Sequence, residues 1–231
     1  MSEPAVDIKN VSRTFRRGGS DFWALRNITL SVDPGSVLII TGRSGSGKTT
    51  LLNILGGLES PSEGEVQVCG HDLTRLSTSK RADFRRNKVG FVFQAFHLIE
   101  EKSAVSNVML PLMIAGAAPG HAEKRALEHL EQVGLSDIAR EKVSTFSAGQ
   151  KQRTALARGL VNDPELVIAD EPTGNLDREN GTAVFSILIE NAADRGKTVL
   201  IASHDTAVIP ETVENIISLE NGTIVHDEKT A

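Results

Sequence analysis

The sequence predicts an α/β fold with a mainly parallel sheet, an antiparallel β subdomain near its start and a helical subdomain inserted near its middle. Three observations indicate this. Short apolar runs rich in valine and isoleucine alternate with helical patterns, which is typical of parallel strands joined by helices. A glycine-rich loop at 42–49 stands between one of these runs and a helix. The pattern then becomes helical from about residue 95 to residue 160.

The composition of the 231 residues is that of an ordinary soluble globular chain. The formal net charge of −5 argues against a nucleic-acid binder, which would carry a basic stripe. Cys69 is the single cysteine, so an intrachain disulfide is excluded and a reducing cytosol fits. The first residues lack a signal-peptide pattern, and no apolar run reaches the roughly 18 to 20 residues that span a bilayer. We therefore expect a cytoplasmic chain.

The first part of the chain predicts an antiparallel sheet. Val6 to Val11 form a first strand, residues 16–20 form a turn, and apolar residues at 28, 30 and 32 alternate with polar ones in a half-buried strand. Phe15 and Trp23 are aromatic residues of this region. Either could stack on a base, and either could belong to the core; their spacing alone favours the core.

The glycine-rich loop follows a β-branched apolar strand at 37–41 and leads into a helix that continues through Leu55. It matches the phosphate-binding pattern of Gly, four free positions and Gly-Lys-Ser/Thr. Glycines allow backbone N–H groups to turn towards phosphates, and the helix N-terminus adds partial positive charge. We expect Lys48 to neutralise the outer phosphates and the Thr49 hydroxyl to bind Mg²⁺. The expected nucleotide-binding residues are Gly42, Arg43, Ser44, Gly45, Ser46, Gly47, Lys48, Thr49 and Thr50. The sequence therefore predicts a P-loop core that binds a nucleoside triphosphate.

The segment after the loop contains the next helix and strand of the sheet. Gly56 and Gly57 end the first helix, and 66–68 form a short strand. Ser77 is the expected N-cap of a charged helix that runs to Asn87. The strand 89–93 then places Gln94 at its end.

The middle of the chain predicts helices with their own apolar faces. Apolar residues at 127, 130 and 133 share one helical face, and Gly134 is a stop signal. A polar turn of small residues at 144–150 precedes another helix through Leu160. We interpret about 95–160 as a helical subdomain inserted into the α/β core.

Two further apolar strands end in residues with distinctive chemistry. The strand 166–169 ends in Asp170 and Glu171, and the strand 198–202 leads to His204. A helix is expected between them at about 180–193, and a hairpin follows at 216–225 around an Asn-Gly turn.

The carboxyl ends of parallel strands meet at one edge of a sheet, so Lys48, Thr49, Asp170, Glu171 and His204 should converge on one triphosphate. Asp170 suits a water-mediated contact to Mg²⁺, which prefers oxygen ligands. Glu171 can deprotonate the attacking water. His204 could hold the γ-phosphate and the water, although a lone histidine is more often structural.

Residues 146–150, Phe-Ser-Ala-Gly-Gln, resemble the Leu-Ser-Gly-Gly-Gln signature of the ATP-binding cassette ATPases, and other phosphate-loop proteins lack such a segment. The resemblance covers almost the whole chain, so it implies one nucleotide-binding domain over 1–231. It implies that Gln94 is the Q-loop glutamine, which acts in catalysis and at Mg²⁺. Asp170 and Glu171 resemble the Walker B pair, 175–177 the D-loop and His204 the switch histidine. It also implies adenine stacking for Phe15, and it leaves Trp23 a structural role.

Within this family the chain looks like the lipoprotein-releasing and macrolide-exporter branch, the relatives of LolD and MacB. The supporting stretches are 52–58, 89–94 and 169–177. The resemblance implies a second copy of the chain, so that Ser147, Gly149 and Gln150 meet the γ-phosphate of ATP bound to the partner copy. It also implies an integral membrane permease, which would hold the chain at the cytoplasmic face of the cell membrane. The apolar segment 108–115 could dock on that permease or belong to the core.

Three positions depart from the pattern of the family. Ala148 replaces a signature glycine, and its methyl group could hinder close approach of the backbone. Phe146 replaces the usual leucine, and Ser106 stands where the branch commonly has an acid. We expect ATP-dependent pairing to be weakened by Ala148 but retained.

Two other functions are compatible with a phosphate loop. A soluble cassette ATPase could act on nucleic acid or ribosomes, but such proteins usually carry two cassettes or a long coiled-coil insertion. A P-loop kinase would need an acceptor pocket and a lid, and the signature-like segment argues against it. The cargo and the direction of transport belong to the permease and are not encoded here.

Overall fold

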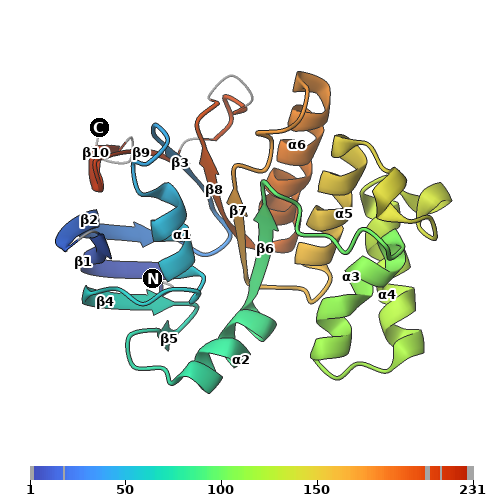
Figure 1. Cartoon of the computed structure of the whole chain (residues 1–231), viewed down its shortest axis with the longest axis horizontal. Coiled ribbons are helices and arrows are strands. Elements are labelled where there is room, and N and C mark those ends of the chain that lie inside the picture. The colour runs from blue at the N-terminus through green and yellow to red at the C-terminus, as the bar shows by residue number, and fades with distance from the viewer. Residues whose placement is uncertain (1–2, 18, 206–208, 214, 228–231) are drawn as a thin grey trace.

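The computed structural model describes residues 3–17, 19–205, 209–213 and 215–227. Figure 1 shows an antiparallel sheet on one side, a larger central sheet, and helices on the far side. This is the α/β architecture that the sequence predicts, with strands and helices alternating after the first hairpin. No helix of the described ranges has the length and hydropathy needed to cross a bilayer.

The antiparallel sheet has four strands in the order β2-β1-β4-β5. They are β1 (Val6–Arg17), β2 (Ser20–Val32), β4 (Glu63–Val68) and β5 (His71–Asp72). Both predicted strands are confirmed, and each extends further toward the 16–20 turn than the apolar pattern indicated. The preference for Trp23 as a core residue is wrong, because its side chain is 37% exposed. It lies in the exposed first part of β2, Ser20 to Trp23, and the buried residues of the strand begin at Ala24.

The central sheet has six strands in the order β10-β9-β3-β8-β7-β6. The five strands from β9 to β6 pair in parallel, and β10 is antiparallel to β9. Their bounds are β3 (Val37–Thr41), β6 (Val89–Phe93), β7 (Leu166–Asp170), β8 (Thr198–Ser203), β9 (Ile216–Glu220) and β10 (Thr223–Asp227). The predicted hairpin is confirmed: Asn221 (φ 48°) and Gly222 (φ 79°) are both left-handed, as a two-residue turn of type I′ requires.

Three helices connect the strands of the two sheets: α1 (Lys48–Leu55), α2 (Thr78–Lys88) and α6 (Arg178–Arg195). Gly56 caps α1 and Gly57 follows with φ 69°, which confirms the predicted end of this helix. Ser77 caps α2 by accepting a hydrogen bond from the Lys80 N–H, also as predicted. In Figure 1, α1 lies between the two sheets, while α6 covers the other face of the central sheet.

The middle of the chain is helical, as predicted. It contains α3 (Ala104–Ile114), α4 (Pro119–Gln132) and α5 (Ala148–Leu160), with short 3₁₀ turns at Ser136–Ile138 and Val143–Thr145. Gly134 has φ 68° just beyond α4, where the sequence predicted a stop. Figure 1 shows α3 and α4 at the edge of the molecule and α5 beside α6.

Two hydrophobic cores lie on opposite faces of the central sheet, because side chains of a strand alternate in direction. Leu38 and Ile40 of β3 belong to the core shared with α1 and the antiparallel sheet. Ile39, between them, belongs to the core shared with α3, α4, α5 and α6. The continuous apolar strands of the sequence are therefore the strands that are buried on both faces.

The helices of the middle block share that second core with β6, β7 and β8, and Phe146 is among its buried residues. The limits of the subdomain at about 95–160 stay a prediction. The segment 108–115 was expected either to dock on a permease or to belong to the core, and it contains both buried and exposed apolar residues. Val108 and Leu112 are buried, whereas Met113 is 41% and Ile114 70% exposed.

Candidate nucleotide-binding site

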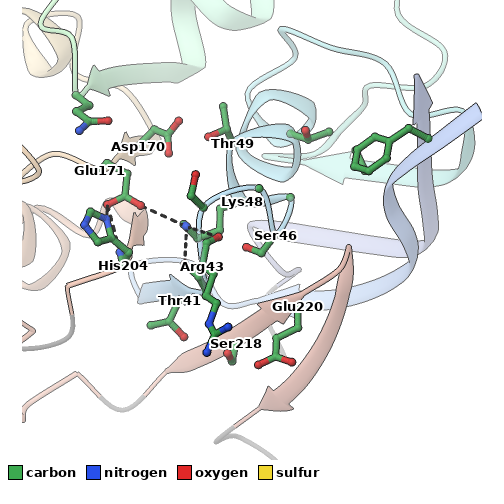
Figure 2. A pocket seen from close by; sticks show the side chains of 18 of the residues that line it. Thr41, Arg43, Ser46, Lys48, Thr49, Asp170, Glu171, His204, Ser218 and Glu220 are labelled. Carbon is green, nitrogen blue, oxygen red and sulfur yellow. Dashed lines mark hydrogen bonds and ion pairs between the residues drawn. The ribbon is translucent and has the colours of Figure 1, made fainter. Parts of the chain in front are cut away.

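The carboxyl ends of four adjacent strands surround one cavity of about 1100 Å³. β3 leads into the glycine-rich loop, β8 into His204, β7 into Glu171 and β6 into Gln94. Figure 2 shows the labelled side chains around this space. Its lining residues are Phe15, Phe22, Ala24, Thr41, Gly42, Arg43, Ser44, Gly45, Ser46, Gly47, Lys48, Thr49, Thr50, Gln94, Asp170, Glu171, His204, Ser218 and Glu220. The predicted convergence of these strand ends is therefore present in the fold.

Two glycines of the loop allow its backbone to approach the backbone of neighbouring strands closely. Gly42 (φ 146°) leaves no room for a Cβ, which would clash with the carbonyl oxygen of Leu219 in β9. Gly47 (φ 111°) is the N-cap of α1, and a Cβ there would lie 2.6 Å from the carbonyl oxygen of Ala24 in β2. The loop is thus wedged between both sheets and directs the N-terminus of α1 at the cavity, which is the arrangement that favours an anion.

Lys48 is the most buried charged side chain of the site, with 6% exposure. Its ammonium donates to the carbonyl oxygens of Gly42 (2.7 Å) and Arg43 (3.3 Å), and it lies 3.3 Å from Glu171 Oε1. A buried cation needs such partners because it has lost its hydration shell. The contacts fix the ammonium at the mouth of the loop, where it faces the cavity.

Glu171 occupies a strained position directly after β7. Its backbone is left-handed (φ 49°), a conformation that non-glycine residues rarely adopt. Its N–H donates to the Ala202 carbonyl at 2.9 Å, and its own carbonyl accepts from the Gly174 N–H at 3.2 Å. This turn directs the carboxylate back over the cavity, and strain of this kind is typical of functional positions.

His204 holds the other oxygen of the same carboxylate. Its Nδ1 lies 2.6 Å from Glu171 Oε2, and its backbone N–H donates to that oxygen at 3.2 Å. Figure 2 shows Glu171 between Lys48 and His204. The histidine is 58% exposed, so it is not a satisfied core residue.

Asp170 and Thr49 lie next to each other at the edge of the cavity (Figure 2). Burial raises the pKa of the Asp170 carboxyl above its ordinary value, against the opposing effect of a hydrogen bond with the Thr49 hydroxyl. The Oδ1 atom of Asp170 is buried without a hydrogen-bond partner. A hydroxyl beside a carboxylate with an unused oxygen is a donor set that suits Mg²⁺.

Gln94 lines the cavity from the end of β6. Its side chain packs so closely on Gly174 that a Cβ at 174 would lie 2.6 Å from Gln94 Nε2. Its backbone carbonyl accepts a hydrogen bond from Asn175 Nδ2 at 3.0 Å. The loop after β7 thus supports this glutamine.

Phe15 and Phe22 face each other across the β1–β2 pair and both line the cavity. The Arg13 guanidinium lies 4.5 Å from the centre of the Phe15 ring, and Arg13 is itself paired with Glu59 at 3.5 Å. Phe15 is therefore braced from one side. Phe22 was missed by the sequence analysis, although its register opposite Phe15 in a tight hairpin could have indicated it. Phe22 is 55% exposed, more than any core role would allow.

The signature-like residues Ser147, Gly149 and Gln150 do not line this cavity. Ser147 caps α5 in a capping box: its hydroxyl accepts from the Gln150 N–H, and its own N–H donates to Gln150 Oε1. A Cβ at Gly149 would lie 2.5 Å from Asn180 Oδ1, so this glycine also makes room for an intrachain contact. Ser147 and Ala148 are exposed at the helix start.

Comparison with known proteins identifies the family of the chain that contains this cavity. A family model described as "ABC transporter" matches residues 25–174, which include the glycine-rich loop, Gln94, the signature-like segment and the Asp170–Glu171 pair. The chain belongs to the ATP-binding cassette transporter family. The predicted family is thus confirmed, and with it the nucleotide-binding, ATP-hydrolysing character of the domain.

Curated relatives at about 40% identity include proteins named as exporters. A macrolide export ATP-binding/permease protein MacB of Rhodopseudomonas palustris is 39% identical over 231 residues, covering 100% of this chain and 35% of its own. A probable syringafactin export ATP-binding/permease protein SyfD of Pseudomonas syringae is 41% identical over 98% of this chain and 34% of its own. The chain therefore spans about a third of the length of these relatives. The expected likeness to the macrolide-exporter branch is confirmed.

Solved cassettes have the same fold. A dimeric ATP-binding cassette in a post-hydrolysis state, bound to ADP and Pi, is 38% identical, with a TM-score of 0.89 over 96% of this chain and 97% of its own. CbiO1 from Clostridium perfringens, part of an ABC transporter complex, is 25% identical, with a TM-score of 0.86 over 98% of this chain and 88% of its own. These similarities confirm the P-loop α/β fold class.

Proposed function

We propose that this cassette binds ATP with Mg²⁺ in the cavity at the strand ends and hydrolyses it with Glu171 as the general base. The observation that carries this proposal is the position of the Glu171 carboxylate, 3.3 Å from Lys48 and 2.6 Å from His204. A carboxylate held at this edge can take a proton from a water that attacks the terminal phosphate. His204 keeps that carboxylate oriented and donates toward the γ-phosphate.

Lys48 changes partners when the nucleotide enters. Its ammonium keeps the carbonyl of Gly42 at 2.7 Å and exchanges the longer contact to Glu171 for oxygens of the outer phosphates. This exchange frees Glu171 Oε1, while Oε2 retains the His204 contact. Backbone N–H groups of residues 42–50 and the N-terminus of α1 hold the remaining phosphate charge.

Thr49, Asp170 and Gln94 are the residues proposed to hold Mg²⁺, with Asp170 acting through a water. Mg²⁺ supplies neutralisation of the charge that develops on the transferred phosphoryl group. The unpartnered Asp170 oxygen and the neighbouring Thr49 hydroxyl support this assignment. Phe15, braced by Arg13, is proposed to stack on the adenine.

A second copy of the chain is proposed to complete the site. Ser147, Gly149 and Gln150 lie outside the cavity of their own chain, and the capped N-terminus of α5 is exposed. Placed against the partner's phosphate loop, Ser147 and the N-terminus of α5 would meet the γ-phosphate. ATP between two copies would join them, and hydrolysis would release them. The dimeric state of a solved relative supports this arrangement.

The partner driven by ATP hydrolysis is proposed to be a membrane permease of the macrolide-exporter or lipoprotein-releasing type. Binding to this permease would place the chain at the cytoplasmic face of the membrane. The names of the curated relatives join an ATP-binding part to a permease, and this chain matches about a third of their length. Met113 and Ile114 at the end of α3 are exposed apolar side chains that could contact such a partner.

The catalytic proposal is tested with Glu171→Gln. The variant should bind ATP with ordinary affinity, form a dimer in ATP and lose turnover about a hundredfold or more. Phosphate release and size-exclusion chromatography with light scattering measure these outcomes. Turnover near the wild-type rate in the variant would refute Glu171 as the base.

The partner proposal is tested by affinity purification of the chain from detergent-solubilised membranes. Recovery of one polytopic membrane protein in stoichiometric amount supports the permease, and its identity would specify the transport system. Copurifying RNA without a membrane protein would favour the soluble cassette ATPase that acts on nucleic acid or ribosomes.

A further inference from the structure

The loop that follows Gln94 has an unusual backbone. Phe96 (φ 55°) and His97 (φ 49°) are consecutive non-glycine residues in the left-handed region. A left-handed backbone is uncommon for residues other than glycine, above all for a bulky residue such as Phe96, so the surroundings must hold two of them in succession. Within the loop, the His97 N–H donates to the Ala95 carbonyl at 2.5 Å, and the His97 ring meets the Phe93 ring edge-on with centroids 5.1 Å apart.

Arg158 of α5 holds this loop from one side. One guanidinium nitrogen, Nη2, donates to the Phe96 carbonyl at 2.7 Å, and Nη1 donates to the His97 carbonyl. The planar fork of arginine matches two adjacent acceptors, which a lysine ammonium cannot do with the same geometry. Turning Phe96 and His97 left-handed is what directs both carbonyls at one side chain.

Asn175 holds the same segment from the other side. Its Nδ2 donates to the Gln94 carbonyl at 3.0 Å, and the neighbouring Gly174 packs against the Gln94 side chain. Gln94 therefore has its own carbonyl fixed by the loop after β7, and the carbonyls two and three residues later fixed by α5. The backbone that carries the Gln94 side chain is thus held at three carbonyls, and the side chain itself packs on Gly174.

The same helix that carries Arg158 begins at the exposed Ser147 cap. α5 is a continuous helix of 13 residues, Ala148–Leu160, with a capping box at its start. Ser147 and Arg158 therefore lie near the two ends of one uninterrupted helix, so the helix joins the exposed cap to the loop that follows Gln94.

We propose that Arg158 and Asn175 are positioning residues that set the place of Gln94 in the nucleotide site, and that Arg158 ties this placement to helix α5. The proposal rests on the Mg²⁺ contact assigned to Gln94 in the proposed function. The two residues act through backbone carbonyls of Gln94 and the loop after it, and neither of them lines the cavity.

The test compares Arg158→Lys with Arg153→Lys in the full chain. Arg153 lies on the same helix and also donates to a backbone carbonyl, that of Val133 at 3.2 Å, which lies away from the Gln94 loop. Lysine keeps the charge and the packed stem. Asn175→Ala is the second variant, because its exposed side chain can be removed without opening the core.

The first readout needs no nucleotide. Amide hydrogen exchange of residues 95–98 should be faster in Arg158→Lys and Asn175→Ala than in the wild type, and unchanged in Arg153→Lys. The second readout is the Mg²⁺ concentration that half-saturates ATP turnover. It should rise about tenfold in both variants, the low end of the loss seen when a residue that orients a metal ligand is removed.

The outcomes separate the proposal from its premise. If either folded variant exchanges these amides like the wild type and keeps its Mg²⁺ dependence, the positioning role is overturned. If Gln94→Ala leaves the Mg²⁺ dependence unchanged, the assigned contact of Gln94 fails. Hydrogen exchange then still decides whether Arg158 and Asn175 hold the loop.

Discussion

Glu171 and His204 are joined by two contacts to a single oxygen: Glu171 Oε2 accepts from the His204 backbone N–H at 3.2 Å and lies 2.6 Å from the imidazole Nδ1. The other oxygen of the carboxylate faces Lys48. Because the chain must turn left-handed at Glu171 to permit this, the carboxylate is directed by its backbone as well as by its partners. The two residues come from β7 and β8, which are neighbours in the sheet.

Loss of the imidazole should impair turnover more than ATP binding. In His204→Ala the backbone N–H contact remains, but the carboxylate loses the partner that orients it and the group that faces the γ-phosphate. We expect turnover to fall about a hundredfold while ATP affinity changes less than about threefold. Phosphate release at saturating ATP and binding of a fluorescent ATP analogue measure the two effects. His121→Ala, at an exposed position of α4, is the control and should behave like the wild type.

Asp170→Asn should stabilise the protein without nucleotide and weaken its response to Mg²⁺. Burial raises the pKa of this carboxyl, so the ionised form is disfavoured in the folded state. The folded state therefore binds the Asp170 proton more tightly than the unfolded state does. The stability gained from this is complete below the ordinary pKa of 3.8 and is lost as the pH rises through the raised pKa of the folded state. The melting temperature of the Asp170→Asn variant should exceed that of the wild type at pH 7.5, and the difference should shrink at pH 4.

Excess Mg²⁺ with ATP gives the complementary measurement. It should raise the melting temperature of the wild type, since a ligand that binds the folded state stabilises it, and should raise that of Asp170→Asn much less. A variant that melts below the wild type at pH 7.5 without ligand would contradict the cost assigned to this buried charge.

The glycine-rich loop and the apolar strands could be predicted from sequence because both are local. Gly42 to Thr49 carry a fixed spacing, and a strand buried on both faces, such as Leu38–Ile40, is uniformly apolar. Parallel crossovers bring the carboxyl ends of strands to one edge of the sheet, so the meeting of Lys48 with Glu171 could also be anticipated.

Contacts between residues that are distant in sequence could not be predicted from local patterns. Trp23 and Phe22 are adjacent in β2, so periodicity places them on opposite faces but cannot say which face meets a cavity. Gly149 resembles a residue that serves a partner chain, yet its missing side chain also accommodates Asn180 of its own chain. The hydrogen bond from Arg158 to the carbonyl of Phe96, in the loop after Gln94, joins residues 62 positions apart, and no local sequence pattern predicts it.

Phe22 should contribute to nucleotide affinity, and its neighbour Trp23 should not. Phe22 lines the cavity opposite Phe15, whereas Trp23 does not line it. Phe22→Ala should weaken ATP binding about tenfold, within the range for loss of a base–aromatic contact. Trp23→Ala is the matched control from the same strand and should leave ATP affinity unchanged. Inorganic tripolyphosphate, which has no base, should compete equally with both variants; equal weakening of ATP binding by the two substitutions would remove Phe22 from the site.

The Cys69 thiol should be unreactive in the folded protein at neutral pH. Burial raises its pKa to about 11, so almost no thiolate is present at neutral pH. Reaction with 5,5′-dithiobis(2-nitrobenzoate) at pH 8 should be at least about tenfold slower in the folded protein than in urea, where the thiol regains an ordinary pKa. Equal rates in the two conditions would show that the thiol is not protected by its surroundings.

Ala148→Gly should strengthen ATP-dependent pairing at a small cost to the isolated chain. Ala148 is the first residue of α5, exposed beside the Ser147 cap, where its methyl group would stand between the helix start and a partner's phosphate loop. Glycine removes that methyl group but destabilises the helix, by up to about 1 kcal/mol. Measured in the Glu171→Gln background, the ATP concentration that half-saturates dimer formation should fall several-fold, while the melting temperature of the monomer falls slightly. Ala118→Gly, at the exposed N-cap of α4, is a control for a glycine at another helix start: its melting temperature should not fall, because glycine is preferred to alanine at an N-cap, and its dimerisation should be unchanged. If Ala148→Gly produced no gain in dimer formation or in turnover, the methyl group would not be what limits the approach of two copies.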